Sequence, residues 1–443
     1  MEQNETIIKK DKQQAPYMEK NIAMNESNTS QNTSKHAHLV FQDLPHIAPS
    51  RGLFPPCKTA KVGNLFYPVI ASDNLMEFIA SDDNLVEAAR KVKGNAFNPS
   101  GSEHGIVKKA CDMFIDNPSF RNIICQDLIQ GIYSPERIAS SPVFKANYMT
   151  LPRGFKYTIN QIVQTMILEV IKASNMSKCM MPYAWGKTSN LSVNAMIESV
   201  DQIRAKGFKC WVSFNMKSLF EKIPHDRLMQ KIHIMFQDKR LAVLICTLLE
   251  LHESTTDGNK RTKCVGIPKD SPLSAMLGYE LYLSELDQEI MRFGLTHVRY
   301  DGEIVVFCDT YAGAKQIKSD LSDFAKKTLG CPFDYRRTTI KDIAHLAFLG
   351  LELQGGRWCI QYKVKNAAAS DYVIDIIIYS RLKEDSQLWE AYRKMTSFIN
   401  FYEGVYALRN EILRLKKWRD EHFTNAIILV EKAKLGLIKI PQK

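Results

Sequence analysis

The sequence has 443 residues, of which 45% are hydrophobic and 24% are charged, as in an ordinary soluble globular protein with room for roughly two or three domains. It contains no run of about 18 apolar residues and no charged-then-apolar leader, so we expect neither a membrane span nor a secretion signal. The net charge is +11, and the first fifty residues carry five Lys against six acidic residues, so the positive excess lies beyond them. A positively charged folded region is expected to bind nucleic acid. The alternative is that the charge only keeps the protein soluble.

The ten cysteines are spread along the chain without a Cys-x-x-Cys pair. Several of them, such as Cys246 and Cys308, lie within apolar stretches. This pattern predicts reduced thiols in a cytoplasmic protein rather than disulfides, and it argues against a zinc ribbon.

The chain divides by composition and periodicity into four parts. Residues 1–55 are rich in Asn, Gln, Ser and Thr and lack periodicity, which predicts a disordered N-terminal tail. In residues 56–207 the spacing of apolar side chains predicts helices over much of 74–138, then over 160–173 and 194–205.

Residues 208–365 alternate between strand and helix patterns, and residues 366–443 are helical and basic. In the third part we expect a strand at 208–214, helices near 224, at 241–251, 272–290 and 312–328, and a hairpin that turns at Gly355-Gly356. The order strand, helix, hairpin, helix, strand is that of the split βαβ, ferredoxin-like plan, so we expect an α+β fold.

The most informative segment is residues 298–307, two apolar strands joined by Asp301-Gly302. An Asp-Gly pair between such strands is the strongest short-range signal for a hairpin, and it suits a turn with positive φ at both positions. Because neighbouring strand residues point to opposite faces, we expect Asp301, one position before Gly302, to point to the opposite face and not to replace the ligand missing at Gly302.

Several motifs occur in the order found in one enzyme family. They are Asn84–Asn95 followed by a poorly matching motif at 98–105, Ile162-Val163-Gln164, Pro182–Gly186, residues 211–226, residues 266–274, residues 281–287, the Tyr300–Glu303 turn and Phe348-Leu349-Gly350. From about residue 74 onward the chain resembles group II intron-type reverse transcriptases, the maturase-like bacterial branch. The resemblance implies a right-hand polymerase fold: an N-terminal extension and fingers (56–207), a ferredoxin-like palm (208–365) and a helical thumb or maturase-like region (366–443).

The family polymerises DNA with two Mg²⁺ ions that palm carboxylates hold. The three aspartates that hold them align here with Asn215, Gly302 and Glu303, so we expect a degenerate catalytic site. Asp270 is a possible substitute ligand that, together with Glu303, could hold one ion weakly. Mg²⁺ is therefore expected as a cofactor only if activity remains.

The resemblance also implies contacts with nucleic acid, although a solvated charged surface is an equally simple interpretation of these side chains. The candidate residues are Lys145, Arg153 and Lys156 in the fingers, Lys217, Lys269 and Arg337 in the palm, and Arg414, Lys416, Lys417 and Arg419 in the thumb.

The function that we predict is RNA binding by a reverse transcriptase-like protein without polymerase activity, in a maturase-like, defence or regulatory role. Structured RNA is the expected partner, DNA is a second candidate, and the sequence predicts no particular protein partner. Two alternatives stay open: a residual RNA-directed DNA polymerase or untemplated nucleotidyl transferase that uses Glu303, Asp270 and Asn215, and a protein-interaction scaffold that does not bind nucleic acid.

Overall fold

The structure is a computed structural model that describes most of the chain after the predicted tail. The described residues are 57–95, 102–139, 141, 154–174, 184–185, 193–216, 218–250, 265–268, 271–382 and 385–437. The predicted N-terminal tail, residues 1–55, lies outside them.

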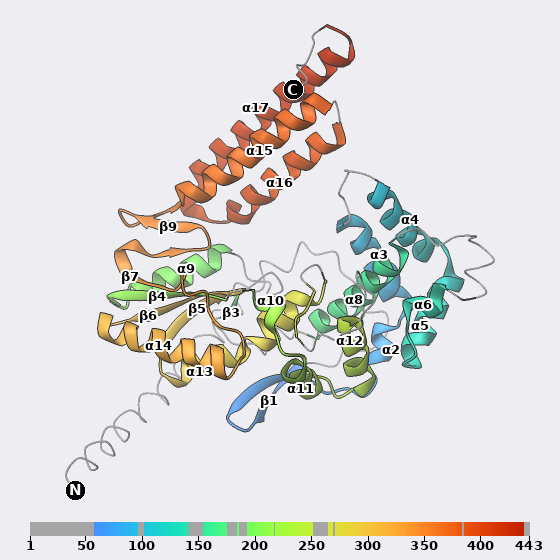
Figure 1. Cartoon of the computed structure of the whole chain (residues 1–443), viewed down its shortest axis with the longest axis horizontal. Helices are drawn as coiled ribbons and strands as arrows, with labels where there is room; N and C mark the ends of the chain where they lie inside the picture. The colour runs from blue at the N-terminus through green and yellow to red at the C-terminus, as the bar shows by residue number, and fades with distance from the viewer. Residues whose placement is uncertain are drawn as a thin grey trace. The chain divides into compact units, whose positions relative to one another are not determined.

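The first part of the chain combines a strand hairpin with a group of helices (Figure 1). Strands β1 and β2 pair along their whole length, an element that the sequence patterns did not predict. Helices then follow where apolar spacing predicts them, and the helix expected at 160–173 begins earlier, at Phe155. The elements are β1 (Cys57–Val62), β2 (Leu65–Ile70), α2 (Leu75–Ile79), α3 (Asp82–Asn95), α4 (Ser102–Asp116), α5 (Pro118–Ile129), α6 (Pro135–Ala139), α8 (Phe155–Ala173) and α9 (Val193–Arg204).

A five-stranded sheet forms the centre of the next part, in the order β3-β5-β6-β4-β7. Strand β4 pairs antiparallel with both β6 and β7, and β3 adds parallel to β5. The predicted order of strand, helices, hairpin and helix is confirmed. The last strand of this sheet, β7, was not predicted, and the strand predicted at 347–353 lies in a separate sheet. The elements of this part are β3 (Ala184–Trp185), β4 (Cys210–Asn215), α10 (Leu219–Lys222), α11 (His225–Met235), α12 (Lys239–Glu250), η3 (Met276–Tyr282), α13 (Ser284–Arg292), β5 (Thr296–Tyr300), β6 (Glu303–Cys308), α14 (Tyr311–Lys327) and β7 (Thr339–Asp342).

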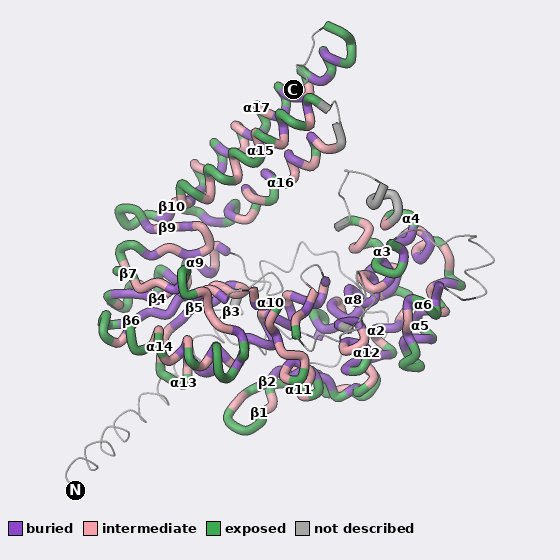
Figure 2. The backbone as a smooth tube through the Cα atoms, viewed as in Figure 1, coloured by how far each residue is buried: buried purple, intermediate pink, exposed green. Residues whose placement is uncertain are grey.

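The two faces of this sheet contribute to two separate hydrophobic cores. Val212, Ile304 and Val306 pack into the first core with α13, α14 and the N-terminal helices, whereas Trp211 and Phe307 pack into the second core with α9 and the C-terminal helices. Figure 1 shows α13 and α14 on one side of the sheet and α9 on the other, and Figure 2 shows that buried residues dominate β4, β5 and β6. Both faces are therefore covered. Because the side chains of β6 are buried on both faces, its sequence is an almost continuous run of apolar residues.

The helix predicted at 272–290 is divided. Its first half is a π-helical turn, η3, and its second half is the regular helix α13. At Gly278 in the turn, a Cβ atom would lie 2.6 Å from the Phe220 ring, so only glycine allows this approach. A π-helical turn is rare and often marks a functional site. Here it presents Tyr279 toward the β5–β6 turn, because a Cβ at Gly302 would lie 3.2 Å from the Tyr279 ring.

The C-terminal part begins with a small antiparallel sheet and continues as a three-helix bundle. The strand predicted at 347–353 is broken, because Leu349 (φ 54°) and Gly350 (φ 73°) form a turn. The turn predicted at Gly355-Gly356 is confirmed, with φ values of 57° and 79°. The elements are η4 (Ile343–His345), β8 (Ala347–Phe348), β9 (Leu351–Gln354), β10 (Arg357–Ile360), α15 (Tyr362–Leu382), α16 (Asp385–Glu403), η5 (Tyr406–Leu408) and α17 (Arg409–Lys434).

Of the helices that the structure describes, none combines the length and the apolarity that crossing a bilayer requires.

A buried ion pair anchors the β5–β6 hairpin. Arg299 and Asp287, 1% and 0% exposed, are joined by hydrogen bonds of 2.7–3.0 Å, and His297 Nε2 lies 3.3 Å from the same carboxylate. Although burial opposes its ionisation, the charge of Arg299 and the contact with His297 hold the pKa of Asp287 below its ordinary value. Arg299 Nη1 also donates to the carbonyl of Asp301 at 2.9 Å, so the pair fixes the position of the turn.

Replacing Arg299 by Met should therefore destabilise the protein strongly. The change leaves the Asp287 carboxylate buried without its main partner, which costs about 3–5 kcal/mol. The matched control is Arg292→Met, because Arg292 is 67% exposed and its ion pair with Glu289, on its own helix, is worth at most about 1 kcal/mol. Urea unfolding followed by circular dichroism measures both changes, and equal losses in the two variants would contradict the anchoring role.

Candidate functional site

A pocket of about 430 Å³ opens where β4 ends and the β5–β6 hairpin turns. It draws its walls from α10, η3, the β8–β9 turn and α16 as well as from the sheet. Its lining residues are Asn215, Met216, Ser218, Leu219, Phe220, Tyr279, Tyr300, Asp301, Gly302, Glu303, Leu349 and Phe401. The pocket thus combines segments that are nearly 190 residues apart in the chain, from Asn215 to Phe401.

The three predicted degenerate positions all line this pocket. Asn215 on β4 is paired directly with Glu303 on β6, and Gly302 immediately precedes it in the turn. Residues paired directly across antiparallel strands point to the same face, with Cβ atoms about 5 Å apart. The Asn215 amide and the Glu303 carboxyl are therefore neighbours. The proposed substitute ligand, Asp270, lies outside the described residues.

The β5–β6 turn differs from its expected form in two ways. Only Asp301 has a positive φ, 51°, whereas the sequence suggested positive values at both turn residues. Asp301 also lines the pocket together with Gly302, its neighbour in sequence, although strand alternation predicted that the two would point to opposite faces. The alternation does not apply because Asp301 is in the loop between β5 and β6 and not in a strand.

Glu303 is held by the turn that follows β8. The amide of Leu349 donates to Glu303 Oε1 at 3.3 Å, and the hydroxyl of Tyr402 on α16 donates to the carbonyl of Leu349 at 2.8 Å. Burial raises the pKa of Glu303, while the Leu349 amide and the charge of Arg337 oppose that rise. These hydrogen bonds connect the Glu303 carboxyl of the five-stranded sheet to the small C-terminal sheet and to the helical bundle.

The carboxylates of the described pocket lining are those of Asp301 and Glu303. Two Mg²⁺ ions require several carboxylate oxygens in near-octahedral geometry, and of the three aligned positions only Glu303 has a carboxylate. Among the residues that the structure describes, no three His, Cys, Asp or Glu side chains come together as metal ligands. A Cβ at position 302 would lie 3.2 Å from the Tyr279 ring, so an aspartate there would require that ring to shift slightly.

Aromatic rings line the pocket as two edge-to-face pairs. The Phe220 and Tyr279 ring centroids are 4.8 Å apart, and those of Tyr300 and Phe401 are 6.0 Å apart. Burial, and secondarily the Asp301 carboxylate, raise the pKa of both Tyr279 and Tyr300, so both hydroxyls keep their protons at neutral pH. The sequence analysis missed Tyr279, Tyr300 and Phe401 as site residues. Of these, only Tyr300 carried a signal, as the first residue of the turn motif.

Glu280, next to Tyr279 on the π-helical turn, is a second residue that the sequence analysis missed. It is 8% exposed, and its Oε1 has no hydrogen-bond partner. Burial raises the pKa of this carboxyl to about 7; the nearby Arg299 opposes the rise and Asp301 adds to it. An unpartnered buried carboxyl costs stability when it is ionised, and such groups are common beside functional sites.

The predicted nucleic-acid contacts fall into three groups. Lys145, Arg153, Lys217 and Lys269 lie outside the described residues. Lys156 pairs with Glu136 at 2.9 Å, and Lys416 pairs with Glu403. Arg337 and Lys417 are 72% and 81% exposed, with carboxylates no closer than 3.8 Å, and Arg414 is exposed without a described partner.

The structure corrects the prediction for Arg419. Its side chain is buried between helices of the bundle, where it donates to Thr396 and Asp420 and lies 4.4 Å from the Tyr392 ring centroid. Because the guanidinium is occupied inside the protein, it is not available to a phosphate group.

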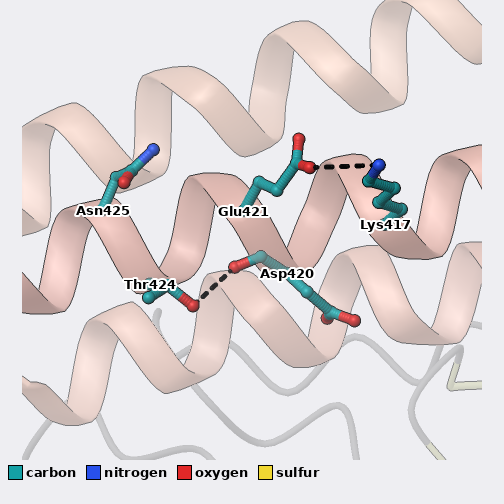
Figure 3. A pocket seen from close by; sticks show the side chains of 5 residues that line it. All are labelled: Lys417, Asp420, Glu421, Thr424 and Asn425. Carbon is teal, nitrogen blue, oxygen red and sulfur yellow. Dashed lines mark hydrogen bonds and ion pairs between the residues drawn. The ribbon is translucent and has the colours of Figure 1, made fainter.

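A shallow hollow on the surface of α17 adjoins the predicted basic cluster (Figure 3). Lys417 contacts Glu421 at 3.8 Å across it, and Thr424 donates to the carbonyl of Asp420 at 2.9 Å. The lining has one cation and two carboxylates, so the hollow itself does not attract an anion. Lys417 is 81% exposed, and Arg414, one helical turn earlier, is exposed outside the lining.

Comparison with known proteins finds distant relatives. No protein-family model matches the chain. The "Uncharacterized 91 kDa protein in cob intron" of Schizosaccharomyces pombe is 24% identical over 235 residues, which cover 51% of this chain and 27% of that protein. The "Putative COX1/OXI3 intron 2 protein" of Saccharomyces cerevisiae is 24% identical over 208 residues, 46% of this chain and 23% of that protein. The chain thus matches about a quarter of the length of these curated relatives.

Among solved structures, apo telomerase from Candida tropicalis aligns with a TM-score of 0.36 and 12% identity, covering 65% of this chain and 59% of that one. A chain of a Cas6-RT-Cas1–Cas2 complex aligns with a TM-score of 0.30 and 12% identity, covering 84% of this chain and 52% of that one. TM-scores below 0.5 do not establish a shared fold, so these two likenesses carry no argument below.

Replacing Glu280 by Gln should stabilise the protein at high pH but not at low pH. The folded-state pKa of about 7 lies above the ordinary value of 4.5, so the folded state binds the proton more tightly than the unfolded state. Stability from this group is therefore present below pH 4.5 and is lost as the pH rises to about 7. We expect the variant to exceed the wild type by about 2–3 kcal/mol at pH 8 and to match it near pH 4.5. Urea unfolding at both pH values measures this, and a difference that is independent of pH would refute it.

Proposed function

We propose that this chain is a reverse transcriptase-like protein that binds structured RNA and does not synthesise DNA, in a maturase-like or regulatory role. The observation that carries the proposal is the pocket at the β5–β6 turn. Asn215, Gly302 and Glu303 meet there in a polymerase-like arrangement, yet they supply a single carboxylate. A fold that keeps this arrangement while its metal ligands are replaced is suited to binding RNA rather than to synthesising DNA.

Two further observations support RNA as the partner. The chain is basic, with a net charge of +11, which favours a polyanion. Its two curated relatives are named for the introns that encode them, and the matched region covers about half of this chain. In this proposal residues 56–207 correspond to an N-terminal extension and fingers, 208–365 to a palm and 366–443 to a thumb.

The charged surfaces suggest where RNA would lie. On α17, Arg414 and Lys417 are exposed one helical turn apart. Beside the pocket, the turn that contains Arg337 bonds to β4, because the amide of Asp334 donates to the carbonyl of Asn215 at 2.8 Å. The exposed guanidinium of Arg337 is therefore held on a rigid turn close to the pocket. We assign phosphate contacts to these three cations.

The test for polymerase activity is primer extension on poly(rA)/oligo(dT) with Mg²⁺ and, separately, with Mn²⁺. We expect no incorporation of deoxynucleotides, because removing a metal clamp that supplies several kcal/mol of transition-state stabilisation lowers the rate by orders of magnitude. Glu303→Ala serves as the control. Incorporation by the wild type that this variant abolishes would show a working metal site and overturn the proposal.

The test for RNA binding compares two double variants on the same helix. Arg414→Gln with Lys417→Gln should weaken binding of a structured RNA and reduce the slope of log Kd against log salt by about one to two, since each phosphate contact contributes slightly less than one. Lys432→Gln with Lys434→Gln removes the same charge from the exposed end of α17 and should change both quantities much less. Fluorescence anisotropy over a salt series measures both.

Equal losses in the two double variants would mean that only net charge matters and would reject the proposed contact surface. No binding by the wild type at low salt would reject RNA binding itself and would favour a protein-interaction scaffold.

A further inference from the structure

The pocket at the β5–β6 turn contains hydrogen-bonding groups that the protein does not use. Asn215 and Glu303 are paired across β4 and β6 and both line the pocket. Glu303 Oε1 accepts from the Leu349 amide, but Oε2 accepts no hydrogen bond from the described residues. The side-chain amide of Asn215 likewise has no partner among the described residues. One amide and one carboxyl oxygen therefore stand side by side, open to a ligand.

Without metal ions, the charge of the described lining does not favour the nucleoside triphosphate that a polymerase would bind. Asp301 and Glu303 are its charged side chains, and no Lys, Arg or His of the described residues joins them. A nucleoside triphosphate carries several negative charges, and without metal ions these carboxylates would repel it. The lining instead suits an uncharged group that donates hydrogen bonds. Arg337 lies outside the lining, and its charge opposes the rise in the pKa of Glu303. Its exposed guanidinium is free to contact a single phosphodiester group.

The walls of the pocket suit a flat ring. Phe220 with Tyr279 and Tyr300 with Phe401 supply aromatic surface from four different elements. Stacking of a base on such side chains is worth about 1–3 kcal/mol. The volume, about 430 Å³, lies within the range of small-molecule sites.

We propose that this pocket binds one unpaired guanine of the RNA, without a metal ion. The N1–H and N2–H groups of guanine donate to the Glu303 carboxylate, and its O6 accepts from the Asn215 amide. This assignment rests on the RNA binding proposed above and names the part of the RNA that the pocket recognises.

Guanine is the base whose hydrogen-bonding edge matches these groups. It is the only one of the four that presents two adjacent N–H donors beside a carbonyl acceptor on its Watson–Crick edge. Adenine and cytosine each place an unprotonated ring nitrogen beside their amino group, which would face a carboxylate lone pair. Uracil offers one N–H between two carbonyls, so one carboxylate oxygen would meet an acceptor. Unpaired bases of RNA are commonly recognised in this way, by aromatic stacking and by bonds to the Watson–Crick edge.

The experiment uses the full chain in EDTA and a hairpin RNA whose uridine loop contains one guanine. The reference is the same hairpin with adenine in place of that guanine. We expect the guanine hairpin to bind about tenfold more tightly, as is typical of a good bidentate contact. Fluorescence anisotropy measures both affinities, and the measurement is repeated with Mg²⁺ in place of EDTA.

Two conservative variants and one control locate the effect. Glu303→Gln keeps the size and an oxygen for the Leu349 amide but replaces the second acceptor by an N–H donor. Asn215→Asp replaces the donor to O6 by a carboxylate. Each should abolish the preference for guanine while leaving the affinity for the adenine hairpin nearly unchanged. Glu352→Gln, on β9 and outside the lining, should leave the preference intact.

The possible failures are distinguishable. Equal binding of the two hairpins, or a preference that survives both variants, overturns the guanine site and leaves RNA binding in place. A preference that appears only with Mg²⁺ also overturns it, because the site is then one for a metal complex. Binding of neither hairpin overturns RNA binding and the guanine site together.

Discussion

The buried ion pair between Asp287 and Arg299 is the interaction on which the candidate site depends. Both side chains are almost completely buried, so their charges must satisfy one another, and the short bonds between them do so. The same guanidinium binds the carbonyl of Asp301, which connects α13 to the β5–β6 turn. A turn with one positive-φ residue is thereby held in one position relative to the helix behind it. Everything that lines the pocket from the hairpin is oriented by this contact.

The electrostatics of the pocket depend on Asn215, Gly302 and Glu303, of which only Glu303 has a carboxyl, and on the neighbouring Asp301. Three carboxylates at the first three positions would repel one another unless cations neutralised them. An amide at Asn215 and no side chain at Gly302 leave less negative charge there than three carboxylates would. Tyr279 fills the space next to Gly302 and contributes apolar area in its place. The result is a pocket lined by aromatic rings, one amide and the carboxyls of Asp301 and Glu303.

The C-terminal bundle is part of the site and not only attached to it. Phe401 lines the pocket, and Tyr402 next to it binds the carbonyl of Leu349, whose amide in turn binds Glu303. Gly350 must be glycine because a Cβ there would lie 2.6 Å from the Tyr402 hydroxyl. A displacement of α16 would therefore change both the aromatic wall and the position of the carboxyl.

The sequence by itself determined the features that depend on local patterns. The β5–β6 hairpin, the Gly355-Gly356 turn and most helices follow from periodicity and turn chemistry. The motif order selected Asn215, Gly302 and Glu303, which line one pocket in the structure. Only the tertiary structure decided the π-helical turn that brings Tyr279 onto Gly302, the burial of Arg419 and of Glu280, and the contribution of Phe401. The physical reason is that these features arise from packing between segments far apart in the chain. No periodicity within a segment records which distant ring or charge will lie against it.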